Sequence, residues 1–291
     1  MDRRRVKAAK LYPVFLPWSG SEDVLLGKKT WKEMKECIGG GVETALVPIG
    51  STEEHGPAIP LDNDIFNSTQ LCINAALRCE NVVVAPPLCF GMSDELLRFS
   101  GTISLTPQTF IACVKDIARS LAGHGFRNII FVTGHGGNIT PMNLVIEELR
   151  RDLPNVLATL VSPWIFSSEY MKQHRESEPG ALDDRMVMHA CETESSLALA
   201  LRPSEVREGQ LVKEVNPILK ERYSKSDPII PGPSLRFGQF RRIMELSETG
   251  VVGDATKATR EKGEKVFRLM IEGLVDLIRS LPTIRRIMKL D

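Results

Sequence analysis

The sequence has no excess of charge of either sign and no long apolar run. Its 37 lysines and arginines match its 37 aspartates and glutamates, so the formal net charge is zero. A neutral chain gives no reason to expect a nucleic-acid partner or an anionic membrane surface. No apolar stretch approaches the roughly 18 residues of a membrane-spanning helix, and the basic start, MDRRRVKAAK, lacks the apolar centre of a signal peptide. We therefore expect a soluble, cytoplasmic protein with no nucleic-acid partner and no membrane partner.

Several signatures of other functional classes are also absent. The six cysteines are scattered, with no C-x-x-C pair, which is typical of buried thiols in a reducing compartment rather than of a disulfide framework. No G-x-S-x-G elbow occurs, and Ser93 in GMSDE lacks that pattern, which disfavours a serine hydrolase. No G-x-G-x-x-G follows a strand, and the GKKT segment at 27–30 lacks the upstream glycine of a phosphate loop, so nucleotide binding is disfavoured as well.

Apolar runs and helical segments alternate along the chain. With 291 residues, 42% of them hydrophobic, the chain is long enough to bury a sizeable core. The expected strands cover 45–49, 82–85, 128–132 and 156–161, and the expected helices cover 30–38, 64–79, 107–123, 140–152 and 256–280. This alternation predicts an α/β fold with a mostly parallel central sheet and helices on both faces, in one domain of residues 1–291. Residues 1–29 are interpreted as a peripheral N-terminal arm, and 227–240 as a Pro-rich loop.

The first expected strand breaks into a polar segment, LVPIGSTEEHGPAIPLDND, at 46–64. In extended backbone, residues two apart point to the same side, so Glu53 and His55 are expected to face one point while Glu54 faces away. Carboxylate oxygens and imidazole nitrogens without thiolate suit a divalent metal. The alternative is a solvated acidic turn followed by a helix N-cap at Asp62 or Asp64.

A second polar break follows the strand at 128–132, in the segment TGHGGN that contains His135. In open α/β sheets, ligands bind beyond the carboxyl ends of the strands, so this break and the one at 46–64 are expected on the same rim. The flanking glycines allow backbone to come close to whatever the imidazole contacts. The alternative is a Gly-rich turn that binds an anion at the N-terminus of the following helix.

The third candidate cluster is the segment HACETESSLALAL at 189–201, which has the pattern of a helix. The helical period places Glu194 on the apolar face and Glu192 on the polar face. A carboxylate on an apolar face must be paired or must bind a metal, because burying it alone costs too much free energy. Glu194 is therefore the expected metal ligand, and Glu192 is expected near the ligands or in solvent. The alternative for Glu194 is a buried ion pair with an arginine or lysine.

The motifs VPIGSTEEHG…LDND, FSGTISL, GFRNIIFVTGHGGN, HACETESSLALALRP and GVVGDATKAT resemble the creatininase (creatinine amidohydrolase) family over roughly residues 30 to 275. The resemblance implies a three-layer α/β/α sandwich and two divalent metal ions per chain, zinc first, with manganese or iron as alternatives. It also implies a small-molecule substrate with an amide C–N bond, and a homo-oligomer, commonly a hexamer.

The resemblance assigns four residues to the metal ligands: Glu53, His55, Asp64 and His135. Asp64 is the expected bridging carboxylate. Creatininase proper has a further glutamate ligand two residues after the motif histidine, where this chain has Gly137. Glu194 is the expected replacement, and Glu192 is the fallback.

His189 matches a histidine near the metals and is the expected proton donor; with Glu192 it forms the predicted catalytic pair. The chain departs from the family at several positions: Ala58 and Leu96 replace histidines, Ser100 replaces a proline, and the aromatic residue expected before His189 is absent where Asp183, Asp184 and Arg185 lie. These departures affect a creatinine substrate more than they affect a metal site.

The predicted function is therefore metal-dependent hydrolysis of the C–N bond of a cyclic amide of the creatinine type, by a metal-activated water. The alternatives are a formamide hydrolase acting on a pyrimidine nucleotide intermediate, or a relative that cleaves a peptide or a sugar-like ring. A family member that binds a ligand without catalysis is the non-enzymatic alternative, and it predicts indifference to chelators.

Overall fold

The structure, a computed structural model, describes residues 22–167, 188–214 and 247–290. Its centre is a sheet of four parallel strands in the order β2-β1-β3-β4. The strands are β1 (Thr44–Ile49), β2 (Val82–Val84), β3 (Asn128–Thr133) and β4 (Leu157–Val161). Every predicted strand is present, and the prediction of a mostly parallel sheet is confirmed.

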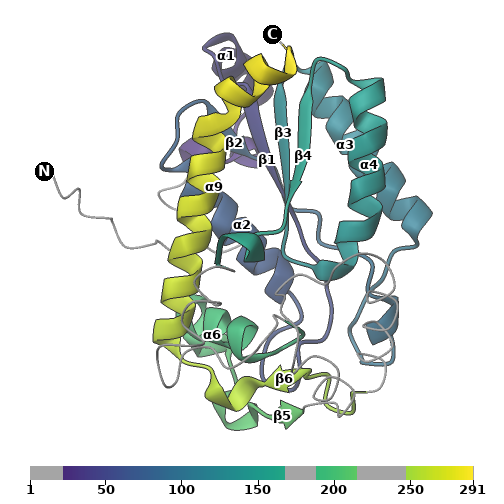
Figure 1. Cartoon of the computed structure of the whole chain (residues 1–291), viewed down its shortest axis with the longest axis vertical. Coiled ribbons are helices and arrows are strands. Elements are labelled where there is room, and N and C mark those ends of the chain that lie inside the picture. Colours follow the sequence, from purple (N-terminus) through teal and green to yellow (C-terminus); the bar gives the residue numbers. More distant parts are fainter. Residues whose placement is uncertain (1–21, 168–187, 215–246, 291) are drawn as a thin grey trace, which may run out of the picture.

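Helices cover both faces of this sheet (Figure 1). Helices α2 (Asn63–Ala76) and α9 (Arg260–Met288) pack on one face, and α3 (Pro107–Gly123) and α4 (Ile139–Asp152) pack on the other. The short helix α1 (Trp31–Gly39) also contributes to the second face. The molecule therefore has the expected α/β/α layers.

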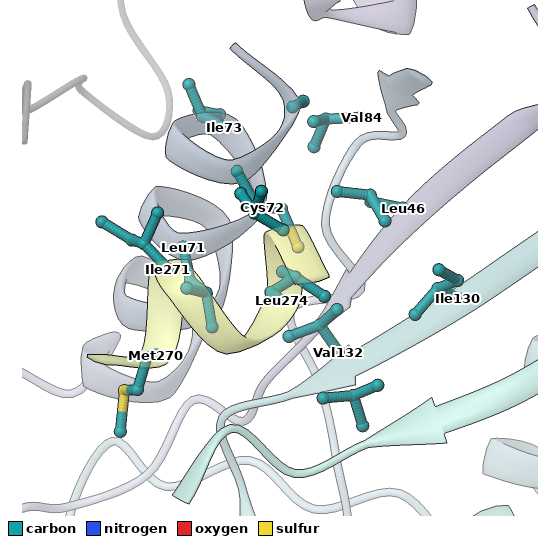
Figure 2. Close-up of a cluster of buried hydrophobic side chains, with 14 of the residues drawn as sticks. Leu46, Leu71, Cys72, Ile73, Val84, Ile130, Val132, Met270, Ile271 and Leu274 are labelled. Carbon is teal, nitrogen blue, oxygen red and sulfur yellow. The ribbon is translucent and has the colours of Figure 1, made fainter. Parts of the chain in front are cut away.

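Alternation along the strands divides the apolar core into two parts. On β1, Ala45 and Val47 belong to the cluster under α3 and α4, whereas Leu46 belongs to the cluster under α2 and α9. Figure 2 shows Leu46 on the side of the sheet that faces labelled side chains of both covering helices, such as Cys72 and Leu274. Burial on both faces explains why the strands are continuous apolar runs.

The helix ends follow local capping chemistry. The Thr30 side chain accepts a hydrogen bond from the backbone of Glu33, which completes a capping box at the start of α1. Thr106 caps α3, with Pro107 at its first position. Thr259 caps α9, so this helix begins later than predicted.

Helix α9 also ends later than predicted, because it continues through Pro282 to Met288. A proline inside a helix removes one backbone hydrogen bond. Here the last turns carry buried Leu281 and Arg285, and the guanidinium of Arg285 donates to the backbone oxygen of Arg127 at 2.9 Å. Tertiary packing thus extends the helix beyond the point where local propensity favours an end.

The structure describes residues 22–29 of the predicted N-terminal arm, and two of them pack against the sheet. Leu25 forms a parallel bridge with Val84, and Val24 and Leu25 are buried. These residues protect the β2 edge of the sheet. Residues 1–21, the Pro-rich loop at 227–240 and the segment 183–185 lie outside the described residues.

Two further elements matter for the site: helix α6 (Glu192–Leu201), and a ribbon of β5 (Lys213–Glu214) with β6 (Gly253–Asp254). Helix α6 packs along α9. Within the described ranges no helix is both long and apolar enough to span a membrane.

Candidate metal centre

The candidate site lies beyond the carboxyl ends of β1 and β3, where the sequence predicts it. Glu53 and His55 follow β1, and His135 follows β3. Helix α2 brings Asp64 in its first turn, and helix α6 brings Glu194 in its first turn. The predicted rim of the sheet therefore collects residues from four separate stretches of the chain.

A glycine at position 134 makes this convergence possible. A Cβ atom built on Gly134 would lie 2.3 Å from the backbone oxygen of Asp64, far inside van der Waals contact. Gly50, directly after β1, is in the same position, because its Cβ would lie 2.5 Å from the backbone nitrogen of Ile65. Glycines at the two strand ends therefore allow the first turn of α2 to pack against the sheet rim.

Asp64 is the centre of the cluster. Its Oδ1 lies 3.1 Å from His55 Nε2, and its Oδ2 lies 3.3 Å from His135 Nδ1. Glu53 Oε1 lies 3.1 Å from His135 Nδ1, and Glu194 Oε2 lies 4.0 Å from His55 Nε2. The structure thus brings all five predicted metal ligands together, and all five are buried.

These five residues form two sets with a common member. Glu53, Asp64 and His135 offer ligand atoms within 4.8 Å of one another, and so do His55, Asp64 and Glu194. A third set of this kind contains Glu53, His55 and His189. The first two sets have the composition of two adjacent metal sites that share the carboxylate of Asp64.

The ring orientations of the two ligand histidines fit a bound cation. His55 Nδ1 lies 3.2 Å from the backbone oxygen of Glu53, and His135 Nε2 lies 2.7 Å from the backbone oxygen of Met92. A carbonyl oxygen only accepts, so each of these nitrogens carries hydrogen. In the neutral rings the opposite nitrogens therefore present lone pairs to carboxylates, an arrangement that is unfavourable without a cation between them.

Asp64 gives a second indication that a cation belongs here. Its Oδ2 is buried and has no hydrogen-bond partner among the described residues. An orphaned carboxylate oxygen carries a large desolvation cost unless a cation compensates it. Carboxylate oxygens and imidazole nitrogens are the donor set of zinc, manganese and iron, so the residues present fit the implied metals.

The pKa shifts of the cluster show that, without a metal ion, its carboxylates favour protonated histidines. Burial disfavours the charged form of His55, but Asp64 and Glu194 outweigh it and raise the pKa of His55 to about 10. Burial also opposes ionisation of Asp64, yet the neighbouring His55 and His135 hold its pKa below the ordinary value. The cluster therefore retains a strong demand for positive charge.

The two glutamates of α6 have different surroundings. Glu194 accepts a hydrogen bond from the backbone nitrogen of Ala190 at 2.6 Å and faces the cluster, and burial raises its pKa. Glu192 is fully buried and pairs with Lys262 of α9. The buried ion pair considered for Glu194 thus occurs at Glu192 instead.

The surroundings of Glu192 correct one expectation and give no support to another. The expectation that it is solvated is wrong, because α9 covers the face of α6 that carries it. Its catalytic role stays a prediction without geometric support, since its carboxylate pairs with Lys262 and belongs to none of the sets of described residues that could hold a metal ion.

Position 137 explains why the missing ligand does not come from the glycine-rich turn. A Cβ on Gly137 would lie 2.3 Å from His135 Nε2 and 2.3 Å from the backbone oxygen of Met92. Glycine is thus required for the hydrogen bond that orients the His135 ring. Glu194 supplies a carboxylate from another element.

Sequence reasoning missed several residues around the ligands. Ser93 donates a hydrogen bond to Glu53 Oε2, and Ser51 Oγ lies 2.5 Å from Ser93 Oγ. Glu54 was expected to face away from the point that Glu53 and His55 share, and its Oε1 lies 2.9 Å from His189 Nε2. The signal for Ser51 and Glu54 was only their position inside the 46–64 motif, and Ser93 had none.

His189, the predicted proton donor, borders the cluster. Its Nδ1 lies 3.7 Å from Glu53 Oε1, and its ring centroid lies 4.6 Å from that of His55. Burial lowers the pKa of His189, but the Glu54 carboxylate outweighs this and raises it above the ordinary value. The ring can thus hold a proton next to the candidate metals.

The fold and this cluster define an α/β/α protein with a buried group of carboxylates and histidines at the rim of its sheet that could hold a metal ion. The family model described as "Creatininase: Creatinine amidohydrolase" matches residues 27–278, so the chain belongs to the creatininase family.

Relatives with different activities resemble the chain. It is 30% identical to the mycofactocin precursor peptide peptidase of Mycolicibacterium smegmatis, over 87% of this chain and 90% of that protein. It is 28% identical to the creatinine amidohydrolase of Pseudomonas putida, over 89% and 98%. A solved mutant creatininase of Zn-Zn type superposes with a TM-score of 0.69 at 28% identity, covering 88% of this chain and 97% of that one.

Proposed function

We propose that this protein is a metal-dependent amidohydrolase that cleaves an amide C–N bond with water. The observation that carries the proposal is the pair of buried ligand sets that share Asp64. Membership in the creatininase family supports hydrolysis as the reaction type. The departures from creatininase at Ala58, Leu96 and Gly137 leave the substrate open to test.

The residues divide into two metal-holding groups. Glu53, Asp64 and His135 would hold one divalent ion, and His55, Asp64 and Glu194 would hold the other. We propose zinc first, with manganese or iron as alternatives that accept the same donors. Divalent ions held there would polarise the substrate carbonyl and lower the pKa of a water molecule.

His189 has the position of the proton carrier in this proposal. Addition of water to the carbonyl carbon releases a proton, and breaking the C–N bond requires a proton on the leaving nitrogen. His189 holds one nitrogen against Glu54 and turns the other toward the cluster. We assign proton delivery to Nδ1, because a histidine pKa lies close enough to operating pH for proton transfer in both directions.

Two substrate classes are proposed. The first is a cyclic amide of the creatinine type, as the family resemblance implies. The second is a peptide amide, and the specific observation in its favour is the 30% identity to a peptide peptidase over most of both chains. By the same resemblance we propose a cytoplasmic homo-oligomer, a hexamer, which light scattering of the purified protein would test.

Hydrolysis by protein reconstituted with zinc or manganese tests the function. Creatinine and a short linear peptide are assayed in parallel, each with an EDTA-treated control. We expect turnover of one substrate at about 1 per second or faster, removed by EDTA and restored by metal. His124→Gln is a matched control, because His124 is exposed and outside the cluster. A fully metal-loaded protein that hydrolyses neither substrate contradicts both substrate assignments. A protein that binds no metal contradicts the proposal of metal-dependent hydrolysis.

A further inference from the structure

The three buried histidines of the centre share one feature and differ in another. Each has one ring nitrogen at hydrogen-bond distance from a backbone carbonyl: His55 at 3.2 Å, His135 at 2.7 Å and His189 at 2.7 Å. In His55 and His135 the nearest carboxylates face the opposite nitrogen. In His189 a carboxylate oxygen, Glu54 Oε1, lies 2.9 Å from the same nitrogen that contacts the carbonyl. Two acceptors of Glu54, its backbone oxygen and its Oε1, therefore contact the His189 nitrogen that is farther from the cluster, Nε2.

The Glu54 side chain is fixed in place for this contact. It is only 5% exposed, and its Oε2 accepts a hydrogen bond from the backbone nitrogen of Gly56 at 2.7 Å. Its Oε1 is also buried, and apart from the 2.9 Å contact with His189 Nε2 it has no hydrogen-bond partner within the described part of the chain. A buried carboxylate oxygen aimed at a ring nitrogen, with no other donor to serve, indicates a role toward that ring.

The wall behind Glu54 comes from residues 249–252. Gly250 has φ +80°, and a Cβ there would lie 1.9 Å from Glu54 Oε2. Only glycine therefore leaves room for the carboxylate. Two residues later, the backbone nitrogen of Val252 donates to the backbone oxygen of His189 at 2.8 Å. The same segment thus confines Glu54 and anchors the main chain of His189.

We propose that Glu54 is a positioning residue for His189. Its carboxylate and its carbonyl together hold Nε2–H away from the cluster, so that Nδ1 faces the metal-binding groups. Removal of the side chain leaves the carbonyl as the only acceptor and opens space in which the ring can turn. The assignment of proton delivery to His189 rests on the proposed function, whereas the orientation of the ring does not.

The test compares Glu54→Ala with Glu54→Gln in the zinc-loaded protein. Long-range ¹H–¹⁵N spectra report the ring nitrogens of the five histidines, and His189→Gln assigns the signal of interest. We expect a slowly exchanging Nε2–H signal in the wild type, its loss in Glu54→Ala, and its retention in Glu54→Gln, which keeps an acceptor oxygen. With the substrate that the wild type hydrolyses, creatinine or the peptide, kcat should fall about 10- to 100-fold in Glu54→Ala, with KM and zinc content unchanged.

A second variant disturbs the contact between Glu54 and His189 by changing the residue that packs against the Glu54 carboxylate. Gly250→Ala should displace the Glu54 carboxylate and lower kcat as Glu54→Ala does, and in the Glu54→Ala background it should add little further loss. Glu214→Gln is the matched control: Glu214 accepts from the backbone of Thr249 at 2.9 Å, so it supports the same segment, and the ring signal should stay wild-type.

The results separate the possible failures. A wild-type ring signal and kcat in Glu54→Ala overturn the proposal, and so does loss of zinc in that variant, which would assign Glu54 to the ligands instead. Loss of the ring signal in Glu214→Gln overturns it too, because the segment alone would then hold the ring. If the wild type hydrolyses neither substrate, the proposed function fails, while the spectra still decide the role of Glu54.

Discussion

The candidate metal centre and the ion pairs around helix α6 both bury charge, but they compensate it differently. At α6, Glu192 pairs with Lys262, and Arg202 pairs with Asp62 and lies over the Phe66 ring. In the candidate metal centre, the ion-pair partners of the carboxylates among the described residues are imidazoles. A lysine or arginine side chain carries its positive charge at neutral pH. A neutral imidazole instead has a lone pair that can bind a proton or a metal ion.

This difference separates a structural role from a chemical one. Buried carboxylates that meet a fixed cation are already compensated and hold elements together, as Glu192 holds α6 to α9. Buried carboxylates that meet only histidines gain compensation from protons or from metal ions, and the choice depends on pH and on metal supply. The predictions below test this distinction, beginning with the largest effect.

Removal of the shared carboxylate should have the largest consequence. Asp64→Ala deletes one ligand from both sets at once, so we expect loss of both metal ions and of turnover together. Metal content measured by inductively coupled plasma mass spectrometry, alongside hydrolysis, checks this. Asp152→Asn, an exposed carboxylate paired with Arg119, should keep wild-type metal content. Two equivalents of tightly held metal in Asp64→Ala would contradict the shared-ligand arrangement.

Removal of His189 should separate metal binding from chemistry. In His189→Ala the five ligands remain, so metal content should stay at the wild-type level while kcat falls by about 10²–10⁴. The measurement is steady-state hydrolysis on protein whose metal content is known. Full activity would exclude His189 from proton transfer, and loss of metal would place it among the ligands with Glu53 and His55.

The ion pair at α6 should show the opposite pattern. Lys262→Met leaves the fully buried carboxylate of Glu192 without its lysine, and breaking such a pair costs on the order of 3–5 kcal/mol of unfolding free energy. Metal content should not change. Urea unfolding of the zinc-loaded variant measures the loss, and the double variant Glu192→Leu with Lys262→Met should recover most of it. A single variant as stable as wild type would show that this pair is not structural.

The sequence predicted where a residue lies when the secondary structure of a single strand or helix determines its place. The strand pattern predicts the sheet, and the sheet places Glu53, His55 and His135 on one rim, because carboxyl ends of parallel strands meet there. The helical period correctly set Glu194 on a different side from Glu192. It could not show that α9 covers the second side, because that contact joins elements that are 70 residues apart.

Contacts of higher sequence separation were out of reach. Glu54 and His189 are 135 residues apart, and Ser93 and Glu53 are 40 apart. No local pattern links such pairs, so the sequence predicted ligands but not the groups that orient them. The late end of α9 was missed for the same reason, since the burial of Arg285 outweighs the local signal of Pro282.

The pH dependence of stability should differ in sign between the metal-free and metal-loaded protein. The pKa of His55 is raised from 6.5 to about 10 in the folded state, so without metal its contribution to stability is complete below pH 6.5 and is lost as the pH rises toward 10. The pKa of Glu194 is raised, so its ionisation also lowers stability as the pH rises above 4.5. The pKa of Asp64 is lowered, so its contribution to stability is complete above pH 3.8 and is lost as the pH falls below that value. Metal binding displaces the histidine protons, so zinc should stabilise the protein more as the pH rises through the same window. Thermal unfolding between about pH 6.5 and pH 9 should therefore show a falling Tm with EDTA and a growing gain from zinc; a Tm that rises with pH in EDTA would show that the histidines of the centre are not held in their charged forms.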